Sequence, residues 1–167
     1  PVLYYKGSLT GLEAPCIAVV GTRNCSEYGK RIAYQLSKEL AQQGFAIISG
    51  LARGIDTKGH QGALQEGTTY AILGSGLDNI YPPENKDLAT RIIKQGAMIT
   101  AYPLGTKAKR QNFPARNRLI SGLSLGNLVI EAPNKSGALI TANYALKQNR
   151  EVFAVPGDIY RKQSIGS

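Results

Sequence analysis

The sequence predicts an α/β fold in which a doubly wound, mostly parallel sheet carries helices on both faces. Short β-branched runs alternate with longer segments of helical period from Cys16 almost to the end of the chain, which is typical of parallel strands joined by crossover helices. With 167 residues, 43% of them hydrophobic and 19% charged, the chain suits one domain with a buried core. We expect this domain over residues 16–167. Residues 1–15 are expected to form an N-terminal arm or linker from a missing preceding segment.

The expected strands are short runs rich in β-branched and small apolar residues. In chain order they are Cys16–Val20, Ala46–Ser49, Tyr70–Leu73, Ala97–Ala101, Leu128–Glu131 and Val152–Val155. The clearest helix follows the first strand, because Ser26 suits an N-cap, Ile32, Leu36 and Leu40 share one face, and Gly44 suits a helix end. Further helices are expected at Thr57–Gln65, Glu84–Lys94, Ala115–Leu123 and Leu139–Lys147.

Crossovers between parallel strands are nearly always right-handed, so this order of elements places the ligand crevice beyond the carboxyl ends of the strands. Glycines and cations occupy the loops that begin there. In chain order these loops contain Gly21, Thr22 and Arg23 with Ser26 and Gly29; Ser49, Gly50, Arg53 and Gly54; Gly74 and Gly76; Lys107, Lys109, Arg110, Phe113, Arg116 and Asn117; and Lys135, Ser136 and Gly137.

These residue types together suit a phosphate-bearing ligand. Glycines let backbone amides approach a phosphate, helix N-termini contribute partial positive charge, and arginine or lysine supplies the countercharge. Phe113 lies among cations and adds a flat apolar face on which a base can stack, a contact worth roughly 1–3 kcal/mol per base in single-strand binders. The pattern therefore favours unpaired nucleic acid over a bare phosphate.

Each residue also has a purely structural interpretation. Gly21 and Gly50 suit ordinary strand-to-helix turns, and Arg23 suits an internal ion pair. Phe113, beside Pro114, also suits a side chain that is buried in the core beneath a loop. For His60 and Asp56 a structural role is the better interpretation. We expect His60 to be a histidine with internal hydrogen bonds and Asp56 to cap a helix. The cations from 107 to 116 also suit a solvated surface.

Charge and composition exclude several classes of protein. A formal net charge of +9 points to a polyanionic partner. The apolar stretches are far shorter than the roughly 20 residues of a transmembrane helix, so no membrane partner is expected. One histidine and two unclustered cysteines, Cys16 and Cys25, supply neither a metal site nor a nucleophile with its base. Two unpaired cysteines suit a reducing cytoplasm.

No cofactor is expected, and neither is enzymatic activity. The dinucleotide fingerprint is absent because Thr22, Arg23 and Asn24 follow Gly21, and the chain has no GxxxxGK[ST] phosphate loop. One alternative stays open: a nucleotide-binding protein or a nucleotide-monophosphate glycosidase-like enzyme on a related fold would use the same glycine-lined crevice.

The strand-end loops resemble the motifs of the DprA/Smf family of bacterial DNA-processing proteins. Gly21-Thr22-Arg23 with Ser26, Tyr28 and Gly29 is similar to G-x-R-x-x-S-x-Y-G, and the segment from Ser49 to Asp56 with His60 is similar to S-G-x-A-x-G-I-D-x-x-x-H. The remaining matches are Gly76–Pro82 to G-x-D-x-x-Y-P, Phe113–Ser124 to F-P-x-R-N-R-x-I-S-G-L-S, Glu131–Gly137 to E-A-x-x-x-S-G, and Val152–Gly157 to V-F-A-V-P-G.

This resemblance implies an extended Rossmann-like fold and sequence-independent binding of single-stranded DNA. It also implies self-association as a homodimer of the full-length protein, and protection of incoming DNA with loading of a RecA-type recombinase in natural transformation and homologous recombination. By position, Arg23 and Lys135 would contact phosphates with support from Arg110, and Phe113 would stack on a base. Gly21, Ser49 and Gly50 would line the floor of the site.

The chain departs from the family pattern in two places. Asn149 stands where the family has glycine, which suggests an asparagine in a left-handed helix cap. The sequence given ends at Ser167, where the family continues with a strand and a helix. The expected domain is therefore truncated at its C-terminal end.

Overall fold

A central sheet forms the middle layer of the computed structural model, which describes residues 2–134 and 136–157. Within these residues the sheet has seven strands in the order β1-β5-β4-β3-β2-β6-β7. The strands are β1 (Tyr4–Gly7), β2 (Cys16–Val20), β3 (Ala46–Ser49), β4 (Thr69–Leu73), β5 (Ala97–Thr100), β6 (Gly126–Val129) and β7 (Glu151–Ala154). Strands β2 to β7 are parallel, and β1 lies antiparallel to β5 at one edge. The predicted doubly wound, mostly parallel sheet is confirmed.

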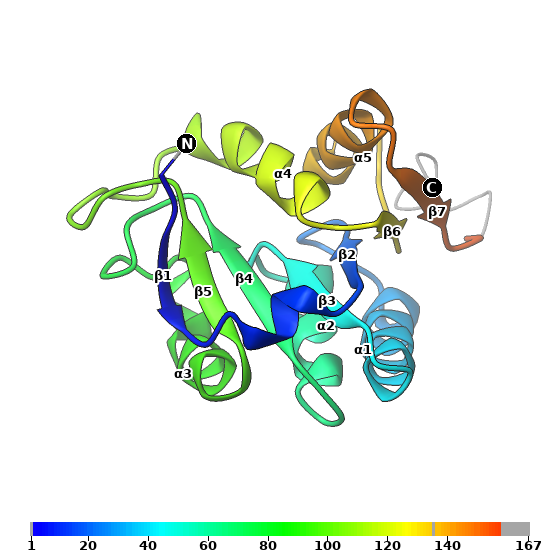
Figure 1. Ribbon diagram of the computed structural model, residues 1–167. Coiled ribbons are helices and arrows are strands. Elements are labelled where there is room, and N and C mark those ends of the chain that lie inside the picture. Colours follow the sequence, from blue (N-terminus) through cyan, green and yellow to red (C-terminus); the bar gives the residue numbers. More distant parts are fainter. Residues whose placement is uncertain (1, 135, 158–167) are drawn as a thin grey trace.

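Helices cover both faces of the sheet (Figure 1). They are α1 (Glu27–Gln42), α2 (Ile55–Ala63), α3 (Lys86–Gln95), α4 (Asn112–Gly122) and α5 (Gly137–Lys147), with short 3₁₀ turns at Thr10–Glu13 and Pro83–Asn85. Helices α1, α2 and α3 lie on one face, and α4 and α5 pack together on the other. Alternate residues of the strands point to these two layers, so the buried strands β2 to β5 contribute to both halves of the core.

The two halves of the core are apolar and closely packed. Under α4 and α5, the strand residues Ala18, Ile48 and Ile72 pack in one cluster with Ile120 of α4. On the opposite face, β2 and β3 pack against α1 and α2, and β4 and β5 pack against α3. Burial on both faces explains why these strands are almost continuously hydrophobic in the sequence.

The predicted caps of the first helix are confirmed. The Ser26 hydroxyl accepts a hydrogen bond from the Gly29 amide at 3.0 Å, and Gly44 follows the helix with a φ of +85°, a conformation in which glycine carries no steric penalty. Asn149 also adopts a left-handed φ of +54° after α5, as the sequence suggested.

Several boundaries differ from the sequence-based expectation. Helix α4 begins at Asn112 rather than Ala115, because proline at position 114 falls in the first turn, where its missing amide costs no hydrogen bond. Strand β6 begins at Gly126, two residues before the expected start. The 3₁₀ turn Pro83–Asn85 precedes α3, so that helix begins at Lys86 rather than Glu84.

Strand β1 was not predicted. It comes from the segment interpreted as an arm, and all of its residues are exposed, so the alternation that signals a half-buried strand is absent. Its backbone pairs with β5, from Tyr4 opposite Thr100 to Gly7 opposite Ala97. That this segment also leads from a preceding domain stays a prediction.

The sheet reverses its winding between β2 and β6. From β2 the chain proceeds to β3, β4 and β5 on one side, and it then crosses through α4 to β6 and β7 on the other. The loops that leave β2 and β6 diverge at this point and open a crevice at the carboxyl ends of the strands.

Candidate nucleic-acid interface

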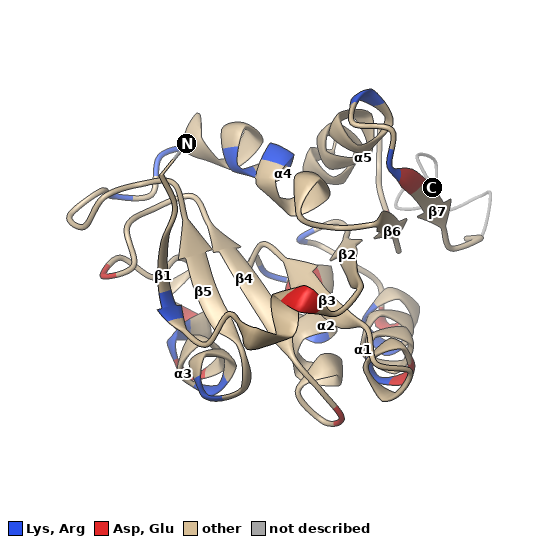
Figure 2. Ribbon diagram, in the orientation of Figure 1, with Lys and Arg blue, Asp and Glu red and all other residues tan. Residues whose placement is uncertain are grey.

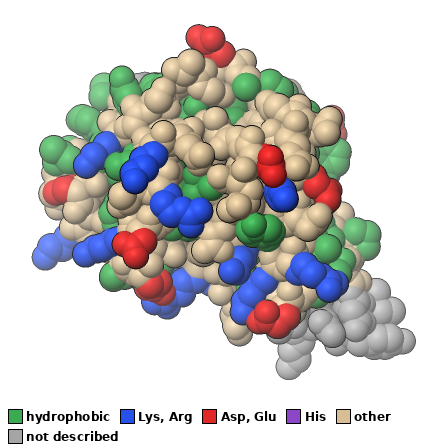
Figure 3. All heavy atoms as spheres, turned by 90° about the horizontal axis from the view of Figure 1, so that it is seen from below, with side chains coloured by type: hydrophobic (Ala, Val, Ile, Leu, Met, Phe, Trp, Pro, Cys, Tyr) green, Lys and Arg blue, Asp and Glu red, His purple; other side chains and the backbone are tan. Residues whose placement is uncertain are grey.

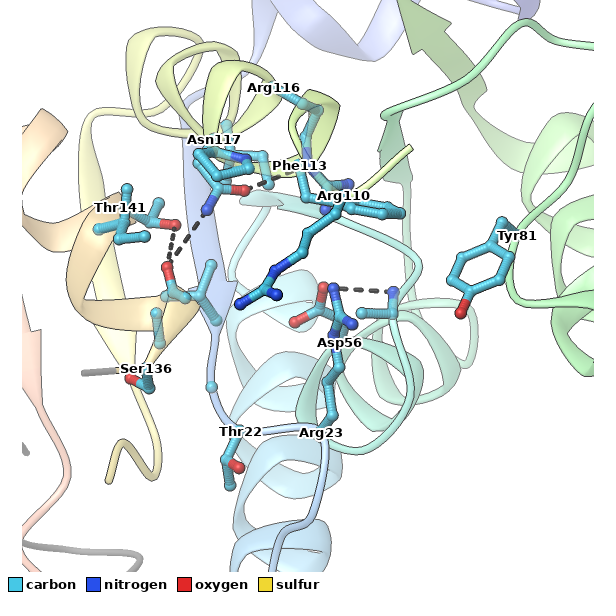
Figure 4. A pocket seen from close by; sticks show the side chains of 18 of the residues that line it. Thr22, Arg23, Asp56, Tyr81, Arg110, Phe113, Arg116, Asn117, Ser136 and Thr141 are labelled. Atoms are coloured by element: carbon cyan, nitrogen blue, oxygen red, sulfur yellow. Dashed lines mark hydrogen bonds between the residues drawn. The ribbon is translucent and has the colours of Figure 1, made fainter. Parts of the chain in front are cut away.

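A pocket of about 590 Å³ lies in this crevice (Figure 4). Its walls come from the loop after β2, the β3–α2 loop, the segment that leads into α4, and the first turn of α5. We call it the strand-end pocket, and its lining includes Gly21, Thr22, Arg23, Ala52, Asp56, Tyr81, Ala108, Arg110, Phe113, Arg116, Asn117, Pro133, Ser136, Gly137, Ile140 and Thr141. Segments more than 100 positions apart in the sequence therefore meet at one site.

Two arginines extend into the pocket from opposite walls. Arg23 comes from the loop after β2 and Arg110 from the segment before α4, and both side chains extend into the pocket (Figure 4). Both are exposed. Among the described residues no carboxylate lies within ion-pair distance of Arg23, so the structure does not support an internal ion pair for this residue. The pocket thus has two cationic groups at its walls.

Phe113 lies at the centre of a group of cations and aromatic rings. Its ring centroid is 5.1 Å from the Arg23 guanidinium carbon and 5.7 Å from that of Arg116, within cation–π range. The ring is half-buried and packs over Gly74, where a Cβ would come within 3.1 Å of it. Part of the Phe113 ring is therefore anchored on the protein, and part of it lines the pocket.

A buried carboxylate and a buried guanidinium form the floor. Burial raises the pKa of Asp56, although the positive charge of Arg116 and the backbone amides of Ala52 and Gly50 favour its ionised form. Burial also lowers the pKa of Arg116 to about 10, against the opposing effect of Asp56. The Arg116 Nη1 donates to the carbonyl oxygens of Gly50, at 2.6 Å, and Ile72. Both groups are thus held by hydrogen bonds from or to the protein backbone.

Three residues expected to contact the ligand have their polar groups engaged within the protein. Ser49 is fully buried, and its hydroxyl donates to the Val19 carbonyl at 2.6 Å. The Gly50 amide donates to Asp56 Oδ2 at 3.1 Å, so it is not available to a phosphate. Arg116 is only 4% exposed. Each of these polar groups must be satisfied internally because water does not reach it, and each acts as support for the pocket.

The glycines are explained by close packing. A Cβ at Gly50 would lie 2.6 Å from Arg116 Nη1 and 2.7 Å from Asp56 Oδ2. A Cβ at Gly21 would collide with the side chain of Ile55. The structure therefore gives a reason for glycine at each of these two turns: the missing Cβ makes room for a side chain of another segment.

The N-terminus of α1 does not face a ligand, contrary to the expectation for Ser26 and Gly29. Glu131, which follows β6 and is 2% exposed, accepts hydrogen bonds from the Ser26 amide at 2.9 Å and from the Ser26 hydroxyl at 2.5 Å. Gly29 is required there because a Cβ would overlap the same carboxylate. The Glu131 side chain therefore occupies this helix end, where the helix dipole favours an acidic residue.

The N-terminus of α5 opens into the pocket instead. Ser136 caps the helix by accepting a hydrogen bond from the Leu139 amide at 3.4 Å, and Ser136, Gly137 and Ala138 line the pocket. Asn117 Nδ2 donates to the Gly137 carbonyl at 3.2 Å, and Thr141 donates to the same oxygen at 3.3 Å, as Figure 4 shows. Asn117 therefore connects α4 to the start of α5 rather than presenting its amide to a ligand.

The remaining candidate residues lie around the rim or outside the described residues. Arg53 is exposed and forms an ion pair with Glu84, a pairing that leaves no signal in the sequence. Lys109 is exposed beside Arg110 but is not part of the lining. Lys135 lies outside the described residues. Tyr81 lines the pocket and was missed as a site residue, although it is an aromatic residue in a strand-end loop.

Basic residues lie around the pocket and elsewhere on the molecule. Figure 2 shows them in the loop before α4, on α4 itself and after β2, and also on α1 and α3, where acidic residues accompany them. Figure 3 shows cations interspersed with acidic side chains on the face seen from below. On α1, Lys30 forms an ion pair with Glu27.

No helix among the described residues has both the length and the apolarity needed to cross a bilayer. No group of three or more histidine, cysteine, aspartate or glutamate side chains among them is arranged to hold a metal ion.

The whole sequence, residues 1–167, matches the family model for DNA recombination-mediator protein A. The chain belongs to this family. Protein Smf of Synechocystis is 50% identical to it over 161 residues, covering 93% of this chain and 40% of that protein. DNA processing protein DprA of Bacillus subtilis is 45% identical, covering 95% of this chain and 54% of that protein. The resemblance inferred from the loop motifs is confirmed.

Solved structures of the family have the same fold. DNA processing protein A of Streptococcus pneumoniae superposes with a TM-score of 0.94 at 44% identity, covering 98% of this chain and 58% of that one. The Helicobacter pylori protein, described for its single-stranded DNA binding mode, superposes with a TM-score of 0.91 at 31% identity, covering 96% and 74%. The extended Rossmann-like fold is confirmed, and the chain spans about half the length of the curated relatives it matches.

Proposed function

We propose that the strand-end pocket binds single-stranded DNA through its sugar-phosphate backbone, without sequence preference and without chemistry on the DNA. The observation that carries this proposal is the convergence of Arg23, Arg110 and the N-terminus of α5 around the ring of Phe113 in one pocket. Cations and a helix N-terminus suit phosphates, and an aromatic ring suits an unpaired base. The H. pylori relative, whose single-stranded DNA binding mode is described, supports the same ligand.

We assign roles to the pocket residues on this basis. Arg23 and Arg110 contact phosphates, the start of α5 at Ser136 and Gly137 receives another, and Phe113 stacks on a base. Lys135 is proposed as a further phosphate contact from its sequence position alone. Asp56, Arg116, Asn117, Ser49 and Gly50 hold the pocket in shape, and Gly21 permits the close approach of Ile55.

The family supports a proposal for the larger role. We propose that this domain serves a protein that protects incoming DNA and loads a RecA-type recombinase, in natural transformation and homologous recombination, as a homodimer of the full-length protein in the cytoplasm. The Smf and DprA relatives support a DNA-processing role. They do not favour the alternative of a nucleotide-monophosphate glycosidase. The acidic residues of the pocket region support this view, since Asp56 and Glu131 are both engaged internally.

A titration with labelled oligonucleotides tests the proposal. We expect oligothymidylate to bind more tightly than a duplex, with an affinity that falls steeply as salt rises, because neutralised phosphates release counterions. Arg23→Ala should reduce the slope of the log-log salt plot by about one if it neutralises one phosphate. The matched control is Arg91→Ala, which removes an exposed arginine of α3 outside the pocket lining and should leave the slope unchanged.

Two outcomes would contradict the proposal. Equal affinity at low and high salt would exclude the phosphate contacts. Release of base from nucleoside monophosphates by the purified chain would favour the glycosidase instead. For Phe113→Ala we expect a loss of about 1–3 kcal/mol in binding with little change in salt slope, and far-UV circular dichroism shows whether the variant remains folded.

A further inference from the structure

Tyr81 and Phe113 form a pair of aromatic rings beside the strand-end pocket. Tyr81 comes from the loop after β4 and Phe113 from the first turn of α4. Their ring centroids are 5.8 Å apart, and the ring planes are inclined at 46°. Both rings line the strand-end pocket and also a small adjoining hollow, which Arg23, Gly50, Ala52, Arg53 and Pro82 complete. We call this second depression the side hollow.

A flat base cannot enter between the two rings. Carbon atoms in contact are about 3.5–4.0 Å apart, so a base held between two parallel rings needs a ring separation of about 7–8 Å, more than the 5.8 Å observed. The side hollow itself has a volume of only about 20 Å³, room for about one water molecule. A bound base must therefore lie on the outer surface of a ring.

One base cannot cover both rings at once. Because the planes of Tyr81 and Phe113 are inclined at 46°, a planar base that stacks on one ring turns away from the other. If both rings carry bases, these are two different bases of the strand. The pair then forms an angled platform that continues the pocket toward the side hollow.

The loop that carries Tyr81 is held in place from several sides. The Ser75 hydroxyl donates to the Asn79 carbonyl at 2.6 Å, and Asn85 Nδ2 donates to the Leu51 carbonyl at 2.8 Å and to the Thr57 hydroxyl at 2.9 Å. Tyr81 nevertheless remains 43% exposed. An aromatic ring that is fixed and exposed loses little entropy when a ligand covers it, which is what a stacking surface requires.

Cations flank the platform on both sides. Arg23 lies 5.1 Å from the Phe113 ring centroid, and Arg53 lines the side hollow next to Tyr81. Arg53 is held by Glu84 in an exposed ion pair, and exposed pairs of this kind contribute little to stability. A phosphate can therefore replace Glu84 as the partner of Arg53 at small cost. A DNA strand that crosses the platform would therefore have an arginine near its backbone at each end, Arg23 beside Phe113 and Arg53 beside Tyr81.

We propose that Tyr81 is a second base-stacking residue and that, with Arg53, it forms a nucleotide subsite adjacent to the one at Phe113. This subsite rests on the proposed function of the strand-end pocket, and it places at least two successive nucleotides of a single strand on the protein. The strand runs from the start of α5, over Phe113, to Tyr81 and the side hollow.

The test compares Tyr81→Ala, Tyr81→Phe and wild type in titrations with an oligothymidylate of about 16 nucleotides, long enough for one such site. Tyr81→Ala should weaken binding by about 5- to 140-fold, the range expected when one stacked base is lost, whereas Tyr81→Phe should bind like wild type. The control is Tyr5→Ala, which removes an exposed tyrosine of β1 outside both linings.

A second probe separates stacking from a merely structural role. An oligonucleotide of the same length with abasic sites throughout keeps the phosphates but offers no base, so Tyr81→Ala should bind it as wild type does. Unchanged binding of oligothymidylate by Tyr81→Ala, or an equal loss on the abasic strand, would overturn the subsite even if Phe113→Ala and Arg23→Ala weaken binding. Failure of the wild-type chain to bind either strand would overturn the proposed function itself.

Discussion

His60 is the single histidine of the sequence, and its fully buried ring predicts a specific loss of stability in acid. Its Nδ1 lies 2.7 Å from the Thr69 hydroxyl, which itself donates to the Ile47 carbonyl at 2.8 Å. The hydroxyl must therefore accept from Nδ1–H, and the proton of the neutral ring lies on Nδ1. The Nε2 atom is buried without a hydrogen-bond partner among the described residues.

Protonation of Nε2 would bury an unpaired charge. Burial, and secondarily the positive charge of Arg116, lower the pKa of His60 from 6.5 to about 3. Because the pKa is lowered in the folded state, the unfolded chain binds a proton below pH 6.5 that the folded protein rejects. Stability is therefore fully present above pH 6.5 and is lost as the pH falls toward 3. Linkage between these two pKa values gives a loss of about 2 kcal/mol by pH 5.

Urea unfolding followed by far-UV circular dichroism between pH 7.5 and pH 5 measures this loss. His60→Gln lacks the titrating group, so its free energy of unfolding should fall less over the same range, and the difference between the two profiles should be about 2 kcal/mol. Parallel profiles would refute the reasoning. So would a proton resonance of the histidine ring that titrates near pH 6.5 in the folded protein, since a single histidine makes the assignment unambiguous.

Three further substitutions test the buried floor and the rim. Arg116→Met should lower the free energy of unfolding, measured in urea, by about 1–3 kcal/mol for each of the Gly50 and Ile72 carbonyl oxygens that lose their buried donor. Gly50→Ala should cost about 1–3 kcal/mol in the same assay, since its Cβ would meet the Arg116 guanidinium at 2.6 Å. Glu84→Gln should raise the affinity for oligothymidylate by up to about five-fold at low salt, because Arg53 is released for a phosphate. An unchanged free energy of unfolding would show that Arg116 is dispensable in the first variant and that the floor adapts to the added Cβ in the second. An unchanged affinity of Glu84→Gln would show that Arg53 does not reach the DNA.

The fold could be predicted because its signals are local. Strands β2 and β3 were predicted with their observed bounds, since buried parallel strands form short apolar runs between glycine-bearing loops. Strand β1 was not predicted because its stability comes from pairing with β5. This pairing leaves no hydrophobic pattern in an exposed run of four residues. Edge strands of this kind are decided by long-range pairing rather than by local sequence.

The convergence of the site was also predictable, but the state of its residues was not. Parallel strands end at one edge, so Arg23, Arg110, Phe113 and Ser136 had to come near one another whatever the strand order. The sequence could not show that Arg53 pairs with Glu84. It also could not show that Ser49 is fully buried, because burial depends on which helix covers a strand end.

The sequence by itself determined the alternation of strands and helices, the edge of the sheet where the cationic loops meet, and the family. Only the tertiary structure decided which helix ends are open to a ligand. The N-terminus of α1 is occupied by Glu131, 105 positions from Ser26, while that of α5 lines the pocket. The physical reason is that a buried carboxylate must find hydrogen-bond donors wherever the folded chain brings them, and no pattern along the chain encodes that distance.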